Sequence, residues 1–91
     1  MKEVRARVVI SGWVQGVCFR ASTQQQAQKR HVKGWVRNLN SGQVEAVFQG
    51  GMLGVEGMIE WCRHGPSGAR VSQIEIFWDQ PLPSETRFNI L

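Results

Sequence analysis

Long hydrophobic runs are missing from this chain of 91 residues. Its apolar stretches span only a few residues each, whereas a helix that crosses a membrane needs about 20. The charged start, residues 1–7, is not followed by the apolar segment of a secretory signal. With 42% apolar residues, the composition is that of a globular protein. We therefore expect a folded cytoplasmic protein that does not bind a membrane.

Cysteine is scarce, because Cys18 and Cys62 are the only two and form no C-x-x-C pair. This argues against a zinc site and against a dense disulfide framework. Two reduced thiols in a cytosolic protein is the simplest interpretation, and the sequence leaves a Cys18–Cys62 bridge open. Phosphatases with a cysteine nucleophile need the pattern C-x5-R, but Gln24 stands where that arginine would be. Cys18 is therefore predicted to be a small apolar residue that fills space behind its loop.

Clustered metal ligands and paired acids are absent from the sequence too. The two histidines, His31 and His64, fall near the ends of predicted helices, where exposed histidines are common. The seven acidic residues show no spacing that would pair two carboxylates for acid–base catalysis. We expect neither a bound metal nor a cofactor.

The elements that are present alternate between strand and helix patterns. Residues 4–10 place an apolar side chain at every second position, which indicates a half-buried strand. Residues 19–30 favour a helix that packs through Phe19, Thr23 and Ala27. Further strands are predicted at residues 32–39, 43–49, 71–78 and 86–91, with a second helix around residues 55–62 that ends before Gly65-Pro66. We expect its first turn to fray, because Gly54 and Gly57 weaken a helix.

The order β-α-β-β-α-β with a short C-terminal edge strand predicts an α+β fold. Two helices would cover one face of an antiparallel sheet. We expect a single domain over residues 1–91 and a monomer.

The net charge of +4 suits a nucleic acid or a small anionic substrate, and no basic run or tail concentrates it. An RNA-binding domain of this architecture would need exposed aromatic side chains on its central strands. The strands at residues 4–10 and 43–49 are predicted to expose only polar side chains there, namely Arg5, Arg7, Glu45 and Gln49. We expect no nucleic-acid partner.

Residues 12–20, GWVQGVCFR, lie where the first strand pattern stops and the helical pattern begins. Gly12 and Gly16 carry no Cβ, so the backbone can turn tightly and approach a ligand. Arg20 falls near the positive end of the helix, where an unpaired cation is unfavourable by roughly 0.3–1 kcal/mol. Free amides and a guanidinium together predict a cradle for phosphate. The sequence shows no evident general acid, so the pattern suits a substrate whose leaving group needs no proton, such as the carboxylate of an acyl phosphate.

Residues 12–20 resemble the first signature of the acylphosphatase family, G-x-V-Q-G-V-x-F-R. Residues 34–38, GWVRN, with Gly42, Val44 and Glu45, resemble the second, although Asn38 alone is typical of a turn. Thr23 and Ala27 match the spacing in that family's first helix, and residues 61–71 resemble its later half. The likeness covers essentially the whole chain.

The resemblance implies a ferredoxin-like α/β sandwich and hydrolysis of acyl phosphates to a carboxylate and inorganic phosphate, without metal or cofactor. Arg20 would bind the phosphate oxygens, and Asn38 would orient the attacking water. Phosphate, the product, would also inhibit. The alternative is a non-catalytic phosphate-binding, RNA-binding or regulatory domain of the same fold. The backbone amides that would assist Arg20 are those of Gln15, Gly16, Val17, Cys18 and Phe19.

This chain departs from the family pattern at the end of the first helix. Arg30 and His31 stand where leucine and glycine are usual. An apolar contact and a glycine that favours the left-handed C-cap are therefore both lost. Trp13 and Trp35 are predicted to be packing residues.

Overall fold

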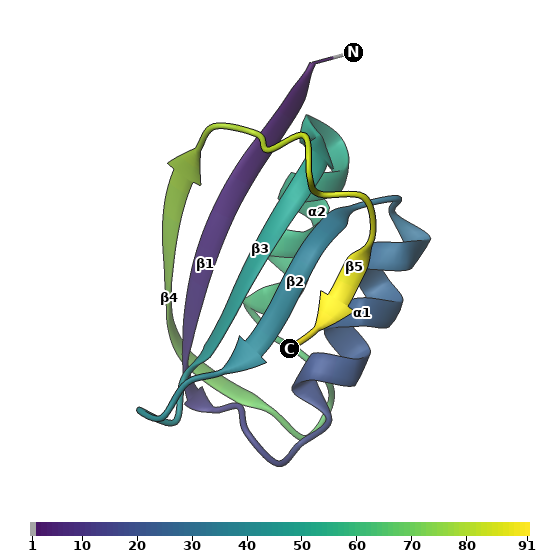
Figure 1. Cartoon of the computed structure of the whole chain (residues 1–91). Coiled ribbons are helices and arrows are strands. Elements are labelled where there is room, and N and C mark those ends of the chain that lie inside the picture. The colour runs from purple at the N-terminus through teal and green to yellow at the C-terminus, as the bar shows by residue number, and fades with distance from the viewer. Residues whose placement is uncertain (1) are drawn as a thin grey trace.

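Five strands form one sheet, and two helices pack on one of its faces (Figure 1). The computed structural model describes residues 2–91. Along the chain the elements are β1 (Glu3–Trp13), α1 (Phe19–Lys29), β2 (Lys33–Asn38), β3 (Val44–Gly51), α2 (Met52–Cys62), β4 (Arg70–Asp79) and β5 (Phe88–Ile90). The strand order across the sheet is β4-β1-β3-β2-β5. The predicted α+β sandwich with βαββαβ order is confirmed.

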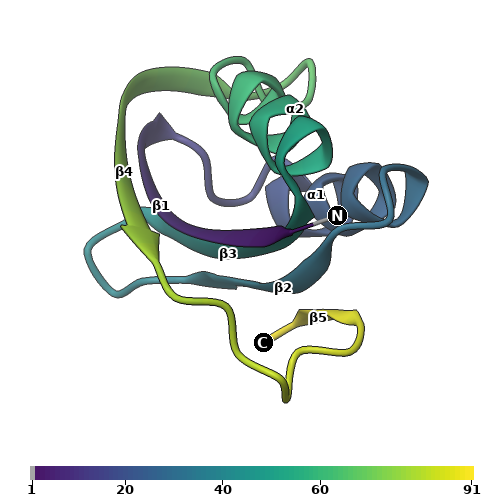
Figure 2. The ribbon, with the colours of Figure 1, turned by 90° about the horizontal axis from the view of Figure 1, so that it is seen from above.

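The core lies between the sheet and the helices, as the view along the sheet shows (Figure 2). The alternation in β1 sends Ala6, Val8 and Ile10 to this side, where each is fully buried. The hairpin of β2 and β3 adds Val36, Val44, Ala46 and Phe48, and α2 adds the predicted residues Val55, Met58, Ile59 and Cys62. Both periodicities predicted from the sequence are therefore confirmed.

The sheet is mixed, which corrects the prediction of a purely antiparallel one. The neighbouring pairs β4–β1, β1–β3 and β3–β2 are antiparallel, but β5 runs parallel to β2. The connection between β4 and β5 crosses to the opposite edge along one end of the sheet (Figures 1 and 2). Because β2 begins at that end, a strand that starts there runs in the same direction as β2.

Helix α1 ends in a left-handed residue, although that residue is not glycine. His31 has a φ of 55°. The Val32 amide donates to the Ala27 carbonyl at 2.9 Å, and the His31 amide donates to Gln28 at 3.2 Å. These two hydrogen bonds define a Schellman motif. The usual C-cap geometry is therefore kept. It is strained at His31, because a Cβ in the left-handed conformation lies too close to the following carbonyl oxygen.

Helix α2 begins at Met52, directly after β3 ends, and therefore starts earlier than the predicted residues 55–62. Its glycines have a packing role. A Cβ on Gly57 would lie 2.8 Å from the Nε of Arg30, and one on Gly54 would lie 3.1 Å from the Arg30 carbonyl oxygen. The glycines therefore let α2 approach the end of α1 closely, which offsets their low helix propensity.

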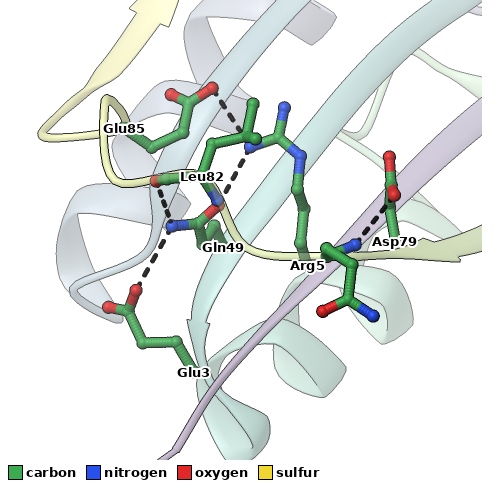
Figure 3. A network of polar contacts seen from close by, with 7 residues as sticks. Glu3, Arg5, Gln49, Asp79, Leu82 and Glu85 are labelled. Atoms are coloured by element: carbon green, nitrogen blue, oxygen red, sulfur yellow. Dashed lines mark hydrogen bonds and ion pairs between the residues drawn. The ribbon is translucent and has the colours of Figure 1, made fainter.

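The outer face of the sheet carries a buried polar network (Figure 3). Gln49 is 1% exposed and exchanges two hydrogen bonds with the backbone of Leu82, each 2.9 Å long. Its oxygen also accepts from Arg5 at 2.9 Å, and its amide donates to Glu3 at 3.2 Å. Arg5 in turn pairs with Glu85 at 3.1 Å. The β4–β5 connection is thereby fastened over the sheet.

This network corrects the expectation that four polar side chains on this face are exposed. Arg5, Glu45 and Gln49 are buried. Glu45 lies between two cations, accepting from Arg37 at 2.7 Å and from Arg7 at 3.2 Å. Sequence periodicity could not reveal the covering segment, because that segment comes from a distant part of the chain. Within residues 2–91, no helix is both long and apolar enough to cross a bilayer.

Candidate active site

The loop between β1 and α1 contains two residues in the left-handed backbone conformation. Gly16 has a φ of 75° and Cys18 a φ of 63°. A left-handed residue redirects successive N–H groups and creates a concave site for an anion. In the described part of the chain, the amides of residues 15–20 find no backbone acceptor. At Gly16 nothing lies within 4 Å of where a Cβ would be, so glycine serves the backbone conformation there.

Helix α1 starts beside these amides without any side-chain cap. Its N-cap is Cys18, which forms no capping hydrogen bond, and the first turn contains no acidic residue. The positive end of the helix dipole is therefore not neutralised by the protein. Free loop amides and an uncapped helix start therefore lie next to each other, an arrangement that suits an anion.

Arg20 lies in the first turn of α1, and β5 helps to place it. Its guanidinium donates one hydrogen bond, 3.3 Å long, to the backbone oxygen of Leu91. The Leu91 amide donates to Val36 at 2.9 Å, and Gln24 on α1 donates to the Phe88 carbonyl at 3.0 Å. Among residues 2–91, no Asp or Glu side chain forms an ion pair with Arg20. Its charge is available to an anion in the loop.

Asn38 is the last residue of β2, and the side chain of Gln15 ties its neighbourhood to the loop. The Gln15 amide donates to the carbonyl oxygen of Leu39 at 2.8 Å and to that of Gln43 at 2.9 Å. The Leu39 amide donates to Gln43 at 2.8 Å, so the hairpin closes at this point. Gln15 therefore links the start of the phosphate loop to the hairpin that carries Asn38.

A cavity of about 210 Å³ brings the predicted residues together. Its walls are Val14, Gly16, Cys18, Phe19, Arg20, Ala21, Asn38 and Ile90. Arg20 is the only charged side chain in this set. The cavity therefore combines a cation, free amides and one side-chain amide, and none of its lining residues is an Asp or Glu that would repel an anion.

Of the site residues predicted from sequence, the cavity is lined by Arg20, Asn38, Gly16, Cys18 and Phe19. Gln15 and Val17 flank it without lining it. Sequence reasoning did not predict that Ile90 lines the cavity, that the Leu91 backbone oxygen contacts Arg20, or that the side chain of Gln15 binds the hairpin. Ile90 and Leu91 reach the site only through the pairing of β5 with β2. Gln15 did offer a signal, because it is a long amide in an otherwise apolar loop.

Two sequence-based expectations about the site were wrong. Cys18 is exposed and lines the cavity, because its left-handed conformation turns it away from the core. Trp13, the last residue of β1, is 71% exposed. Both cysteines are free thiols, and burial raises the pKa of the Cys62 thiol far above its ordinary value. Residues 2–91 contain no cluster of three metal-binding side chains.

Known proteins match this chain over nearly its whole length. The family model described as Acylphosphatase matches residues 6–90. An acylphosphatase of Chloroflexus aurantiacus is 52% identical over 91 residues, which is 100% of this chain and 99% of that relative. The crystal structure of acylphosphatase from Bacillus subtilis has a TM-score of 0.92 at 32% identity, covering 97% of this chain and 98% of that one. The structure of an acylphosphatase from Coxiella burnetii has a TM-score of 0.91 at 34% identity, covering 98% and 93% respectively.

Proposed function

Because the chain belongs to the acylphosphatase family and is an enzyme that hydrolyses acyl phosphates, we propose that Arg20, Asn38 and the loop amides carry out this reaction. One observation supports the assignment above the others. A single cavity is lined by both side chains and by the loop whose amides are free. Nothing else in the described fold combines these groups.

The phosphoryl group is held by the loop. The backbone amides of Gln15, Gly16, Val17, Cys18 and Phe19 donate to its oxygens, and Arg20 adds a charge-assisted bond. The free end of the α1 dipole favours the same negative charge. Because the donors are fixed before substrate arrives, they stabilise the charge that builds up on the equatorial oxygens in the transition state.

The attacking water is held by Asn38. Its side-chain amide can both donate and accept, so it orients the oxygen lone pair of a water toward phosphorus. The hairpin that carries Asn38 is braced by Gln15, which keeps this water in line with the breaking bond. Positioning of this kind replaces a strong general base.

No general acid is required at the leaving group. An acyl phosphate releases a carboxylate, which is stable without a proton, whereas a phosphate monoester releases an alkoxide. The cavity walls supply no acidic side chain, which matches the first reaction and disfavours the second. We extend the proposal to a cytoplasmic monomer that works without metal, cofactor or nucleic acid and is inhibited by its product, inorganic phosphate.

The test follows the loss of benzoyl phosphate absorbance with purified, chelator-treated protein. Wild-type protein should turn over the substrate, and Asn38→Ala should lose about 10²–10³ in kcat, the usual effect of removing one transition-state donor. Asn40→Ala, in the neighbouring turn, is the matched control and should retain activity. Equal turnover by wild type and Asn38→Ala would remove Asn38 from the mechanism.

A second variant tests the role of Arg20. Arg20→Lys keeps the positive charge but loses the planar fork that binds two phosphate oxygens at once. Both KM and the inhibition constant of inorganic phosphate should rise by at least tenfold. If both constants stay near the wild-type values, the proposed contact between Arg20 and phosphate is wrong.

A further inference from the structure

The cavity that contains Arg20 and Asn38 has apolar walls that the chemistry described above does not use. Half of the residues that line it carry hydrocarbon side chains, namely Val14, Phe19, Ala21 and Ile90. Val14 and Phe19 are only 1% and 2% exposed, so they form part of its floor. Ala21 is exposed, and Ile90 is 40% exposed. These last two residues, the apolar pair, therefore present hydrocarbon surface where the cavity meets solvent.

The packing of α1 against β5 brings the apolar pair to one side of the cavity. The two elements run in opposite directions beside each other (Figure 1). Gln24 donates to Phe88 at 3.0 Å, and Arg20, one turn earlier on α1, donates to Leu91, which is further along the chain than Phe88. Each member of the apolar pair lies between these two contacts on its own element. The hydrogen bonds that place Arg20 therefore also fix the separation of the apolar pair.

The volume of the cavity limits how much of a substrate fits inside it. At about 30 Å³ for each water-sized group, 210 Å³ holds roughly seven such groups. The three phosphoryl oxygens, the bridging oxygen and the attacking water use about five of them. Little more than the carbonyl group of an acyl phosphate can then lie inside. The rest of the acyl group has to pass the exposed walls of the cavity.

We propose that Ala21 and Ile90 determine the acyl-group specificity of the enzyme and favour a bulky apolar acyl group over acetyl. This inference rests on the proposed function, because it places the reacting phosphoryl group in the loop beside Arg20. Ile90 supplies hydrocarbon surface that a large acyl group covers and acetyl does not reach. The single methyl group of Ala21 leaves room for that contact, so the size of residue 21 sets the largest acyl group that is accepted.

The test compares acetyl phosphate with benzoyl phosphate, with phosphate release giving kcat and KM for each. The wild-type enzyme should show a KM about fivefold lower for benzoyl phosphate, because the ring covers more apolar surface. Ile90→Ala should remove most of this difference and leave the KM for acetyl phosphate within about twofold. Ala21→Leu, which keeps a good helix former, should raise the KM for benzoyl phosphate about tenfold and again spare acetyl phosphate.

The matched control is Gln25→Leu, which adds the same side chain at an exposed position one turn further along α1, outside the cavity. It should change neither KM by more than about twofold. The inhibition constant of inorganic phosphate is the second readout. It should stay near the wild-type value in every variant, because phosphate has no acyl group to contact the apolar pair.

Three results would overturn the inference. The first is equal KM values for the two substrates in the wild-type enzyme, and the second is an equal effect of Ile90→Ala and Ala21→Leu on both substrates. The third is a rise in the phosphate inhibition constant that parallels the rise in KM, which would trace the effect to a displaced Arg20. A lack of turnover of both substrates by wild-type protein would instead reject the proposed function.

Discussion

Replacing Gln49 with leucine tests how strongly the β4–β5 connection is held. The amide of Gln49 takes part in four hydrogen bonds, two of them to the backbone of Leu82 and two to the charged groups of Arg5 and Glu3. Leucine is similar in size but can neither donate nor accept. Gln49→Leu therefore leaves these partners facing an apolar side chain in a site that is only 1% exposed to solvent.

The size of the effect follows from the partners. The two bonds to Leu82 contribute about 1 kcal/mol each, and the bond from Arg5 contributes about 1.5 kcal/mol. The contribution of Glu3 is small, because its side chain is 41% exposed and regains water. Allowing about 1 kcal/mol for the apolar surface that leucine buries, the loss is about 2–3 kcal/mol. This corresponds to a fall in Tm of roughly 10–20 °C for a domain of this size.

Urea unfolding followed by tryptophan fluorescence measures this loss. The matched control is Gln73→Leu, an exposed glutamine on β4, which should change the free energy of unfolding by less than about 0.5 kcal/mol. A second readout concerns the active site, because the connection leads into β5 and the Leu91 backbone oxygen that contacts Arg20. KM for benzoyl phosphate should rise in Gln49→Leu. A loss below about 1 kcal/mol would refute the idea that Gln49 fastens this segment.

Three further outcomes are expected from the contacts described above. His31→Gly should raise the free energy of unfolding in urea by about 0.5–1 kcal/mol, because glycine tolerates the φ of 55°; an unchanged midpoint would show that this residue is not strained. Gln15→Met removes both donors to the hairpin, so kcat for benzoyl phosphate should fall about tenfold while the phosphate inhibition constant stays within about threefold; unchanged kcat would show that the brace is dispensable. Burial raises the pKa of Cys62, so the unfolded chain loses this proton first above about pH 9, and the free energy of unfolding should then fall by about 1.4 kcal/mol per pH unit. Cys62→Ala should flatten that alkaline slope. The chain contains no tyrosine, so no tyrosine titrates in the same pH range. An identical slope in the variant would show that another group causes it.

Local patterns in the sequence predicted the element order, the helix-facing residues and the phosphate loop. These features depend on periodicity and on glycine positions, which act over a few residues. The parallel pairing of β5, the burial of Arg5 and Gln49 and the exposure of Trp13 were not predicted. The first two depend on where a distant segment crosses the sheet, and the exposure of Trp13 depends on which parts of the sheet the rest of the chain covers. No local pattern encodes either.

The candidate site divides in the same way. Arg20 and the loop amides follow from the end of a strand pattern, a pair of glycines and the start of a helix. Asn38 gained its role only through the family resemblance, because an asparagine before a turn is common in any hairpin. The Ile90 wall and the Leu91 backbone oxygen required the three-dimensional arrangement. The assignment of chemistry to these residues stays a prediction until the kinetic tests above.

The link from Gln15 to the hairpin has a consequence for the thermodynamics of catalysis. It joins the loop proposed to hold phosphate to the hairpin that carries Asn38 through two direct hydrogen bonds. The disorder that a flexible site would lose on binding substrate is already lost when the chain folds. We therefore expect hydrolysis to proceed without a closing lid, with an activation entropy close to that of a reaction within one molecule.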